Sequence, residues 1–278
     1  MGAQAPIGVF DSGLGGLSVL KHIRACMPHE DLLYFADSGF APYGSRSESE
    51  IVARTLAMAE FLMQRHAKAL VVACNTATAA AIKALRTHYP GLPVVGVEPG
   101  LKPAAALTRS GTVGVLATKF TLSSEKFNLL REQISSASNV RFLLQPCVGL
   151  VDQVEKGELR SAETATLVLR YVVPLLEQGA DTLVLGCTHY PFVLPLIEEV
   201  AGRHAAHPVT IVDTGEPVAR QLLRLLNERG LCRQNTDGES GNVIGFTSGS
   251  ETALAGAFAM LLHLHPDITR VTAAPSGV

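Results

Sequence analysis

Two of the five cysteines stand where a thiol could take part in acid–base chemistry. Cys74 and Cys187 each follow a run of small and β-branched apolar residues, and each precedes short polar residues and a helix-like segment. A thiol at the start of a helix lies near the positive end of the helix dipole, which favours the thiolate. Either cysteine alone could be a buried spacer, but two in equivalent places predict a pair of reactive thiols.

Two like thiols suit the inversion of a stereocentre at a C–H bond. Inversion needs a base on one face of the carbon and an acid on the other, and the roles exchange in the reverse direction. An unperturbed thiol has a pKa of about 8.5, closer to neutrality than a carboxylate or a lysine. The pair therefore predicts a racemase in which Cys74 and Cys187 act as opposed acid and base. Substrate between them would hold the two sulfurs about 6–8 Å apart.

Polar residues near these thiols, and at the end of the first apolar run, could bind the substrate. Asp11 ends that run, where it could hold a substrate ammonium group or act only as a helix N-cap. His189 lies two residues after Cys187 and could tune its proton affinity, or be a hydrogen-bonded structural histidine. Hydroxyls, amides and backbone N–H groups could bind a carboxylate. The other candidates are Ser12, Tyr43, Gly44, Asn75, Thr76 and Thr188.

The chain carries no motif for a cofactor or a metal. The glycines after Asp11 fail the dinucleotide pattern G-x-G-x-x-G, because Ser18 stands where the last glycine belongs. No two cysteines have the C-x-x-C spacing of zinc or redox sites. No lysine is singled out as a Schiff-base partner for pyridoxal phosphate. We therefore expect an enzyme that needs neither cofactor nor metal.

Short β-branched runs alternate with longer segments whose apolar residues recur at helical spacing. This alternation predicts an α/β fold with mainly parallel sheets, in which ligands bind beyond the carboxyl ends of the strands. The expected helices lie in Ser49–His66, Thr78–Tyr89, Ala162–Gln178 and Pro217–Arg229. The expected strands are Ile7–Phe10, Leu32–Phe35, Ala69–Ala73, Val94–Val97, Val113–Leu116, Arg141–Leu144, Thr182–Leu185, Val209–Val212 and Val243–Phe246.

A weak internal sequence repeat indicates two similar α/β halves. The stretch from Ile7 to Ser12 resembles the stretch from Val113 to Thr118, and the residues around Cys74 resemble those around Cys187. The two offsets are 106 and 113 residues (113 − 7 and 187 − 74). Pro99, Gly100 and Pro103 punctuate the chain between the halves. Coincidence between two valine-rich strands is the alternative.

Composition bounds the class of protein. The chain has 278 residues, 47% hydrophobic and 17% charged, which is enough for two folded domains. The net charge of −2 and the lack of a long basic run give no sign of nucleic-acid binding. No apolar run reaches the ~18 residues of a membrane helix, and Met1 to Pro6 has no signal-peptide pattern. We expect a cytoplasmic protein without a membrane partner.

Several motifs together resemble the glutamate racemase family of bacterial cell-wall synthesis. They are Asp11-Ser12-Gly13-Leu14-Gly15-Gly16, Pro42-Tyr43-Gly44, Cys74-Asn75-Thr76-Ala77 and Gly186-Cys187-Thr188-His189-Tyr190-Pro191, and the likeness spans nearly the whole chain. The resemblance implies cofactor-free interconversion of L- and D-glutamate for peptidoglycan and cell shape, with Cys74, Cys187, Asp11 and His189 as catalytic residues. Asp11 and His189, together with the other candidates above, also match substrate-contacting positions of the family.

The resemblance also implies an arrangement of domains. One α/β domain would comprise residues 1–98 and 213–278, because the end of the chain returns to the first domain. The second domain would comprise residues 99–212, with the active site in the crevice between the two. A homodimer is a further possibility.

Two positions depart from the family pattern as we read it. Phe40 stands where many members have arginine, and Asp152 is taken to stand where many have glutamate. Three alternatives stay open at this point. The first is a racemase of aspartate or another acidic amino acid, and the second is a non-catalytic α/β protein that binds a small acid. A cysteine hydrolase is the third, although it would need only one nucleophile.

Overall fold

The computed structural model describes residues 2–234 and 240–271, and the chain divides into two compact units. Unit 1 is formed by Met1–Val97 together with Gly215–Val278, and unit 2 by Glu98–Thr214. The sequence-based prediction set these boundaries at residues 98 and 213. That the two units act as separate functional domains stays a prediction.

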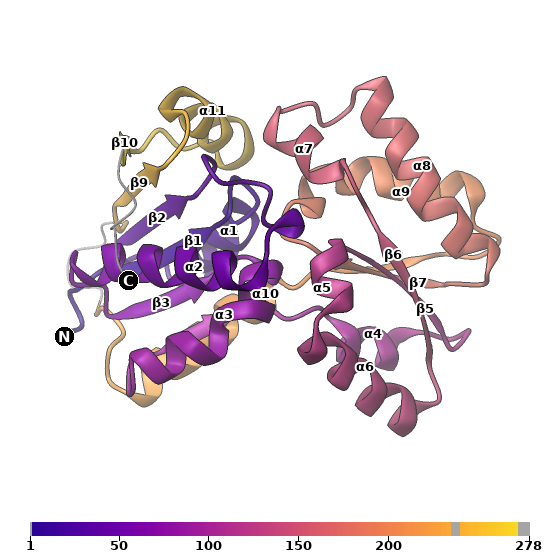
Figure 1. The fold of residues 1–278 in the computed structure, drawn as a ribbon, viewed down its shortest axis with the longest axis horizontal. Helices are drawn as coiled ribbons and strands as arrows, with labels where there is room; N and C mark the ends of the chain where they lie inside the picture. Colours follow the sequence, from indigo (N-terminus) through magenta and orange to yellow (C-terminus); the bar gives the residue numbers. More distant parts are fainter. Residues whose placement is uncertain (1, 235–239, 272–278) are drawn as a thin grey trace. The chain divides into compact units, whose positions relative to one another are not determined.

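Unit 1 is built on a six-stranded parallel sheet with the order β10-β9-β2-β1-β3-β4 (Figure 1). All described residues of its three central strands are buried, as expected for a parallel sheet covered on both faces. The strands are β1 (Ile7–Asp11), β2 (Leu32–Ala36), β3 (Ala69–Val72), β4 (Val94–Gly96), β9 (Val243–Thr247) and β10 (Asp267–Arg270).

The helices of unit 1 pack in pairs. Helix α1 packs against α10, and α2 packs against α3. The right-handed β–α–β crossovers from β1 to β2 and from β2 to β3 run in opposite directions along the sheet, which puts α1 and α2 on opposite faces. The helices are α1 (Leu17–Cys26), η1 (Tyr43–Ser45), α2 (Glu48–Met63), α3 (Asn75–His88), α10 (Gly215–Glu228) and α11 (Glu251–Leu262).

Unit 2 repeats the centre of this design with a four-stranded parallel sheet in the order β6-β5-β7-β8. Its strands are β5 (Thr112–Ala117), β6 (Arg141–Pro146), β7 (Thr182–Gly186) and β8 (Thr210–Val212). Its helices are α4 (Leu101–Leu107), α5 (Lys119–Ser123), α6 (Glu125–Ser138), α7 (Leu150–Glu155), α8 (Ala162–Glu177), η2 (Tyr190–Val193) and α9 (Leu194–His204). The order matches β2-β1-β3-β4 of unit 1, so the two α/β halves that the sequence predicts are confirmed.

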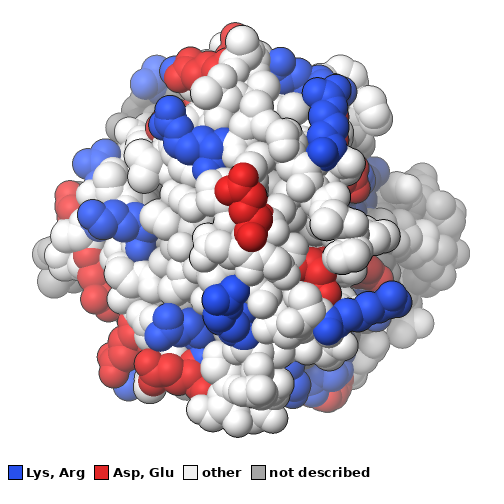
Figure 2. Space-filling model, turned by 90° about the vertical axis from the view of Figure 1, so that its right-hand side faces the viewer, with Lys and Arg blue, Asp and Glu red and all other residues white. Residues whose placement is uncertain are grey.

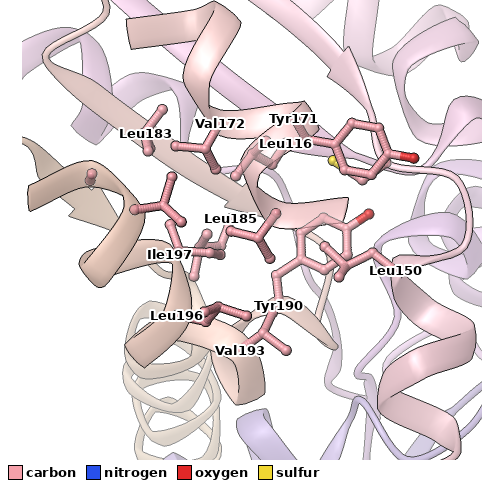
Figure 3. Close-up of a cluster of buried hydrophobic side chains, with 14 of the residues drawn as sticks. Leu116, Leu150, Tyr171, Val172, Leu183, Leu185, Tyr190, Val193, Leu196 and Ile197 are labelled. Carbon is pink, nitrogen blue, oxygen red and sulfur yellow. The ribbon is translucent and has the colours of Figure 1, made fainter. Parts of the chain in front are cut away.

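Two apolar clusters hold unit 2 together. One includes Val172 of α8, Ile197 of α9 and Leu185 of β7 (Figure 3). The other includes Leu101 of α4 and Phe127 of α6 against Val115 of β5. The sheet is thus covered by apolar side chains from helices on both sides. Cys187 belongs to the first cluster, so its position is fixed by core packing.

Within the described part of the chain, we find no helix that is long and apolar enough to cross a membrane.

Candidate active site

In unit 1, Cys74 lies just beyond the carboxyl end of β3 and caps the amino end of α3. Its side chain is 5% exposed, and its sulfur accepts a hydrogen bond from the Ala77 N–H at 3.5 Å. The thiol contacts the Ser12 hydroxyl at 3.5 Å. Burial raises the pKa of the Cys74 thiol well above its usual range, and the Asp11 carboxylate adds to this rise. These surroundings favour the protonated form of the Cys74 thiol.

Asp11 ends the neighbouring strand β1, and its carboxylate organises the loop that leads to α1. One oxygen accepts from the Ser12 N–H at 2.7 Å, and the other accepts from the Gly16 N–H at 2.5 Å. Gly16 has no room for a side chain, because a Cβ there would lie 2.7 Å from the Asp11 Cβ. The N-cap of α1 is Gly16 and not Asp11, so the N-cap alternative is wrong. Asp11 binds the loop before this helix, and its charge acts on Cys74.

Asn75 and Thr76 are the first two residues of α3, and both are buried. The Asn75 amide nitrogen donates to the Val97 carbonyl at 3.4 Å. Its carbonyl oxygen is buried and has no hydrogen-bond partner among the described residues. A buried acceptor without a partner carries an energetic penalty that a ligand can relieve, so Asn75 is suited to accept from a substrate N–H.

The Tyr43 and Gly44 positions form the turn η1, which lies against α3. Tyr43 is buried and its hydroxyl donates to a carboxylate oxygen of Asp37 at 2.6 Å. Burial, together with the charge of Asp37, raises the pKa of the Tyr43 phenol well above its usual range. The phenol is a neutral donor, and it is close enough to Cys74 for the two groups to interact electrostatically. Our sequence analysis did not single out Asp37, although it directly follows a buried strand.

In unit 2, Cys187 occupies the place after β7 that Cys74 occupies after β3. It is 6% exposed, and its sulfur lies 3.7 Å from Nδ1 of His189. On the other side of the ring, Nε2 of His189 lies 2.6 Å from a carboxylate oxygen of Glu155. Burial lowers the pKa of His189, but its contacts with Cys187 and Glu155 outweigh burial and hold the pKa well above its usual range. The imidazole is therefore a cation beside the sulfur.

Glu155 is a member of this site that the sequence analysis missed. We took Asp152 as the counterpart of the family glutamate, but the carboxylate that contacts His189 belongs to Glu155. Both residues lie in α7, three positions apart, and Glu155 is its last residue. Sequence inspection fixed on the first acidic residue after Leu150-Val151, whereas the pairing depends on how α7 packs against η2. That Asp152 stands at the family position stays a prediction, while Glu155 is the carboxylate beside His189.

A third buried thiol was also missed. Cys147 follows β6 as Cys74 follows β3, and it lies in the apolar cluster that contains Cys187 and Tyr190. Figure 3 shows Tyr171 and Tyr190 in this cluster. The Cys147 sulfur contacts the Gln145 carbonyl at 3.4 Å, and burial raises the pKa of the thiol. The rule that chemistry follows strand ends would have identified it.

The predicted site residues therefore form two groups, each within its own unit. In unit 1, Asp11, Ser12, Asn75, Thr76 and Tyr43 lie around or near Cys74 at the carboxyl edge of the sheet, with Gly44 beside Tyr43. In unit 2, Thr188 and His189 follow Cys187, and Thr188 is buried. Among residues 2–234 and 240–271, no three or more His, Cys, Asp or Glu side chains are grouped so as to hold a metal ion.

Two parallel α/β units, each with a buried thiol after an equivalent strand and a charged side chain beside it, fit an enzyme that carries out acid–base chemistry. The family model of Asp/Glu/hydantoin racemases matches residues 8–222. The chain belongs to this racemase family.

Similar proteins agree with this assignment. A glutamate racemase of Methylococcus capsulatus is 51% identical over 276 residues, 99% of this chain and 97% of its own. One of Ectopseudomonas mendocina is 55% identical over 82% of this chain and 85% of its own. Among solved structures, the Francisella tularensis glutamate racemase in complex with D-glutamate matches with a TM-score of 0.84 and 27% identity, over 99% of this chain and 100% of its own. A glutamate racemase of Bacillus anthracis matches with a TM-score of 0.85 and 33% identity, over 96% of this chain and 97% of its own.

Proposed function

We propose that this protein interconverts L- and D-glutamate without a cofactor, with Cys74 and Cys187 as opposed acid and base. One observation carries the proposal. Each unit holds one buried thiol after an equivalent strand, and the two thiols have different electrostatic surroundings. Cys74 lies beside the Asp11 carboxylate, which together with burial favours its neutral form, whereas Cys187 lies 3.7 Å from the cationic His189. Two thiols in unlike surroundings suit the opposed acid and base roles that a two-base inversion requires.

Binding of the substrate would change the state of Cys74. The ammonium group of an amino acid is a cation, and a cation beside Asp11 and Cys74 favours the thiolate. The Asp11 carboxylate and the unpaired carbonyl oxygen of Asn75 are acceptors for that ammonium group. For the enantiomer whose α-proton faces Cys74, the substrate therefore helps to form the thiolate that removes this proton.

The carbanion that forms after proton removal needs stabilisation by fixed dipoles. Asn75 and Thr76 begin α3, where the positive end of the helix dipole favours a carboxylate. Thr188 and His189 lie in the corresponding place after β7. Donors fixed in a buried site stabilise developing negative charge more strongly than water does. We assign these residues to the substrate carboxylates, with Ser12, Tyr43 and Gly44 completing the unit 1 side.

The cellular role and partners follow from the proposed reaction. We propose that D-glutamate from this enzyme supplies peptidoglycan synthesis, and that the enzyme works in the cytoplasm on a free amino acid, with neither nucleic acid nor membrane as partner. Figure 2 shows acidic and basic side chains interspersed on one face, without a continuous basic patch there. A homodimer stays a prediction, which light scattering during gel filtration would test.

Racemisation in D₂O tests both the reaction and the two-base mechanism. Starting from L-glutamate, two opposed thiols should give D-glutamate that carries deuterium, while the remaining L-glutamate at early times carries almost none. Comparable early labelling of both enantiomers would contradict two separate bases. A higher kcat/KM for aspartate would move the substrate assignment to aspartate. Failure to label or invert either amino acid would favour the non-catalytic binding protein.

A further inference from the structure

A buried carboxylate outside the predicted site collects side chains from distant segments of unit 1. Asp37 directly follows β2 and is 0% exposed. Its oxygens accept from the Tyr43 hydroxyl at 2.6 Å, from the Arg54 Nε at 2.9 Å, and from the Ser248 hydroxyl at 2.6 Å. A second nitrogen of Arg54 lies at 2.5 Å, so the arginine binds the carboxylate with both arms. This is the polar centre that holds Tyr43.

Arg54 is kept in place from its other side by Phe40. The guanidinium carbon lies 3.8 Å from the centre of the Phe40 ring, and the side chain of Arg54 is only 13% exposed. Stacking on an aromatic face screens the ion pair from water and fixes the plane of the guanidinium. Phe40, which departs from the family pattern as we read it, is therefore part of the support for this arginine.

The same contacts fix the turn that presents Tyr43 and Gly44. The Phe40 N–H donates to the Asp37 carbonyl at 2.9 Å, and Arg46 donates to the Phe40 carbonyl at 3.3 Å. Both hydrogen bonds lie within the segment from Asp37 to Arg46 and stabilise its folded-back course. Its only charged anchor in the core of the unit is the Asp37 carboxylate, and Arg54 is the cation bound to that carboxylate within the described residues. Loss of the cation would leave a buried carboxylate short of donors and would release the turn.

We propose that Arg54 is a positioning residue for substrate binding, which acts through Asp37 to hold the Tyr43–Gly44 turn. The inference rests on the proposed function only in taking glutamate as the ligand. Arg54 lies on α2 and contacts the Asp37 carboxylate, which accepts the hydrogen bond from the Tyr43 hydroxyl. Its direct effect is to orient that carboxylate. It therefore governs how well the substrate is held, and it has no part in proton transfer.

The test compares Arg54→Ala and Arg54→Lys with the wild type by steady-state racemisation and by calorimetric binding of D-glutamate. Removing a charge-assisted anchor should raise KM and Kd about tenfold in Arg54→Ala, with kcat changed less than about threefold. Arg54→Lys keeps the positive charge but cannot donate two parallel hydrogen bonds to the carboxylate. Its KM and Kd should therefore lie between those of the wild type and Arg54→Ala. Arg233→Ala is the matched control, because Arg233 pairs with Asp31 at the opposite end of β2.

A double-mutant cycle with Tyr43→Phe separates positioning from general destabilisation. If Arg54 acts through the Tyr43 hydroxyl, Arg54→Ala should raise KM much less in the Tyr43→Phe background than in the wild type. Additive effects, an unchanged KM in Arg54→Ala, or an equal rise of KM in Arg233→Ala would each overturn the inference. A wild type that binds glutamate but does not racemise it would overturn only the proposed function, since the Kd values still report on the turn. A wild type that does neither would overturn both.

Discussion

At the scale of single residues, the two thiols differ in what surrounds them. Cys74 has Asp11 and Ser12 beside it, whereas Cys187 has the cationic His189, which Glu155 supports. Similar residues in dissimilar surroundings are a general way to assign acid and base roles within one site. The chemistry is therefore set by neighbours, because the two cysteines are chemically identical.

Replacing either thiol should abolish racemisation. Cys74→Ser and Cys187→Ser should fold and should each lose several orders of magnitude in kcat/KM, because a serine hydroxyl is a far weaker acid and does not form the base at neutral pH. Cys26→Ser and Cys232→Ser are the controls, since neither cysteine follows a sheet strand directly. Near-normal turnover of Cys187→Ser in a chiral assay would refute the mechanism.

The His189–Glu155 pair should give the protein a pH-dependent stability. The pKa of His189 is raised in the folded protein, so its contribution is complete below the unfolded value of about 6.5 and is lost as pH rises through the raised pKa. Glu155→Gln should cost about 1.5–3 kcal/mol at pH 6 and less in alkaline solution. Urea denaturation across this pH range measures the difference. If the difference in unfolding free energy between the wild type and Glu155→Gln grew with rising pH, the His189–Glu155 pairing would be contradicted.

At the scale of elements, each thiol is placed by a strand that ends and a helical segment that begins. In unit 1, the loop from β1 to α1 also lies very close to Ala73, the residue before Cys74. At Gly16, a Cβ would meet the Tyr34 hydroxyl at 2.8 Å and the Ala73 Cβ at 3.1 Å, in addition to Asp11. The φ angle of Gly16 is −61°, so glycine is required here by space and not by backbone conformation. The loop from β1 to α1 can then lie against the segment that leads to Cys74.

Gly16→Ala should therefore damage both stability and activity. The added methyl group must displace Asp11 or its neighbours, at an expected cost of about 1–3 kcal/mol, and the displaced carboxylate should reduce kcat/KM. Gly256→Ala is the matched control, because Gly256 lies in α11 with nothing within 4 Å of its Cβ position. That variant should gain up to about 1 kcal/mol from helix propensity and keep full activity. Equal behaviour of the two variants in thermal melts and assays would refute the steric argument.

At the scale of the whole molecule, two α/β units each supply one thiol, and the end of the chain returns to unit 1. That return places β9 beside β2, with Ser248 just after β9, and so adds one of the donors to Asp37. The repeated strand order explains why two similar sequence motifs occur so far apart. It also makes both halves of the chain necessary for the proposed reaction.

The proposed reaction should proceed with no added cofactor. Electrostatic stabilisation of the carbanion comes from donors of the chain itself, so activity should survive extensive dialysis against a chelator, within about twofold. The purified protein should also lack the visible absorption band of a pyridoxal-like group. Loss of activity that zinc or pyridoxal phosphate restores, as measured by polarimetry, would contradict this prediction.

The sequence by itself determined the α/β class and the positions of the two thiols. Apolar periodicity marks strands and helices locally, and in parallel sheets the residue after a strand lies at the ligand-binding edge. Both Cys74 and Cys187 follow from that rule. The motifs between residues 11 and 191 then indicated the family, which the family match confirms.

Only the tertiary structure decided which neighbours complete each group. Glu155 reaches His189 across 34 positions, and Ser248 reaches Asp37 across 211. The contacts of Asp37, which follows β2, depend in the same way on packing. They bring it together with Arg54 of α2 and Tyr43 of η1. Local patterns encode the period and burial of each element but not the order of strands in a sheet. Contacts between distant residues are fixed by that order, and so they appear only when the chain has folded.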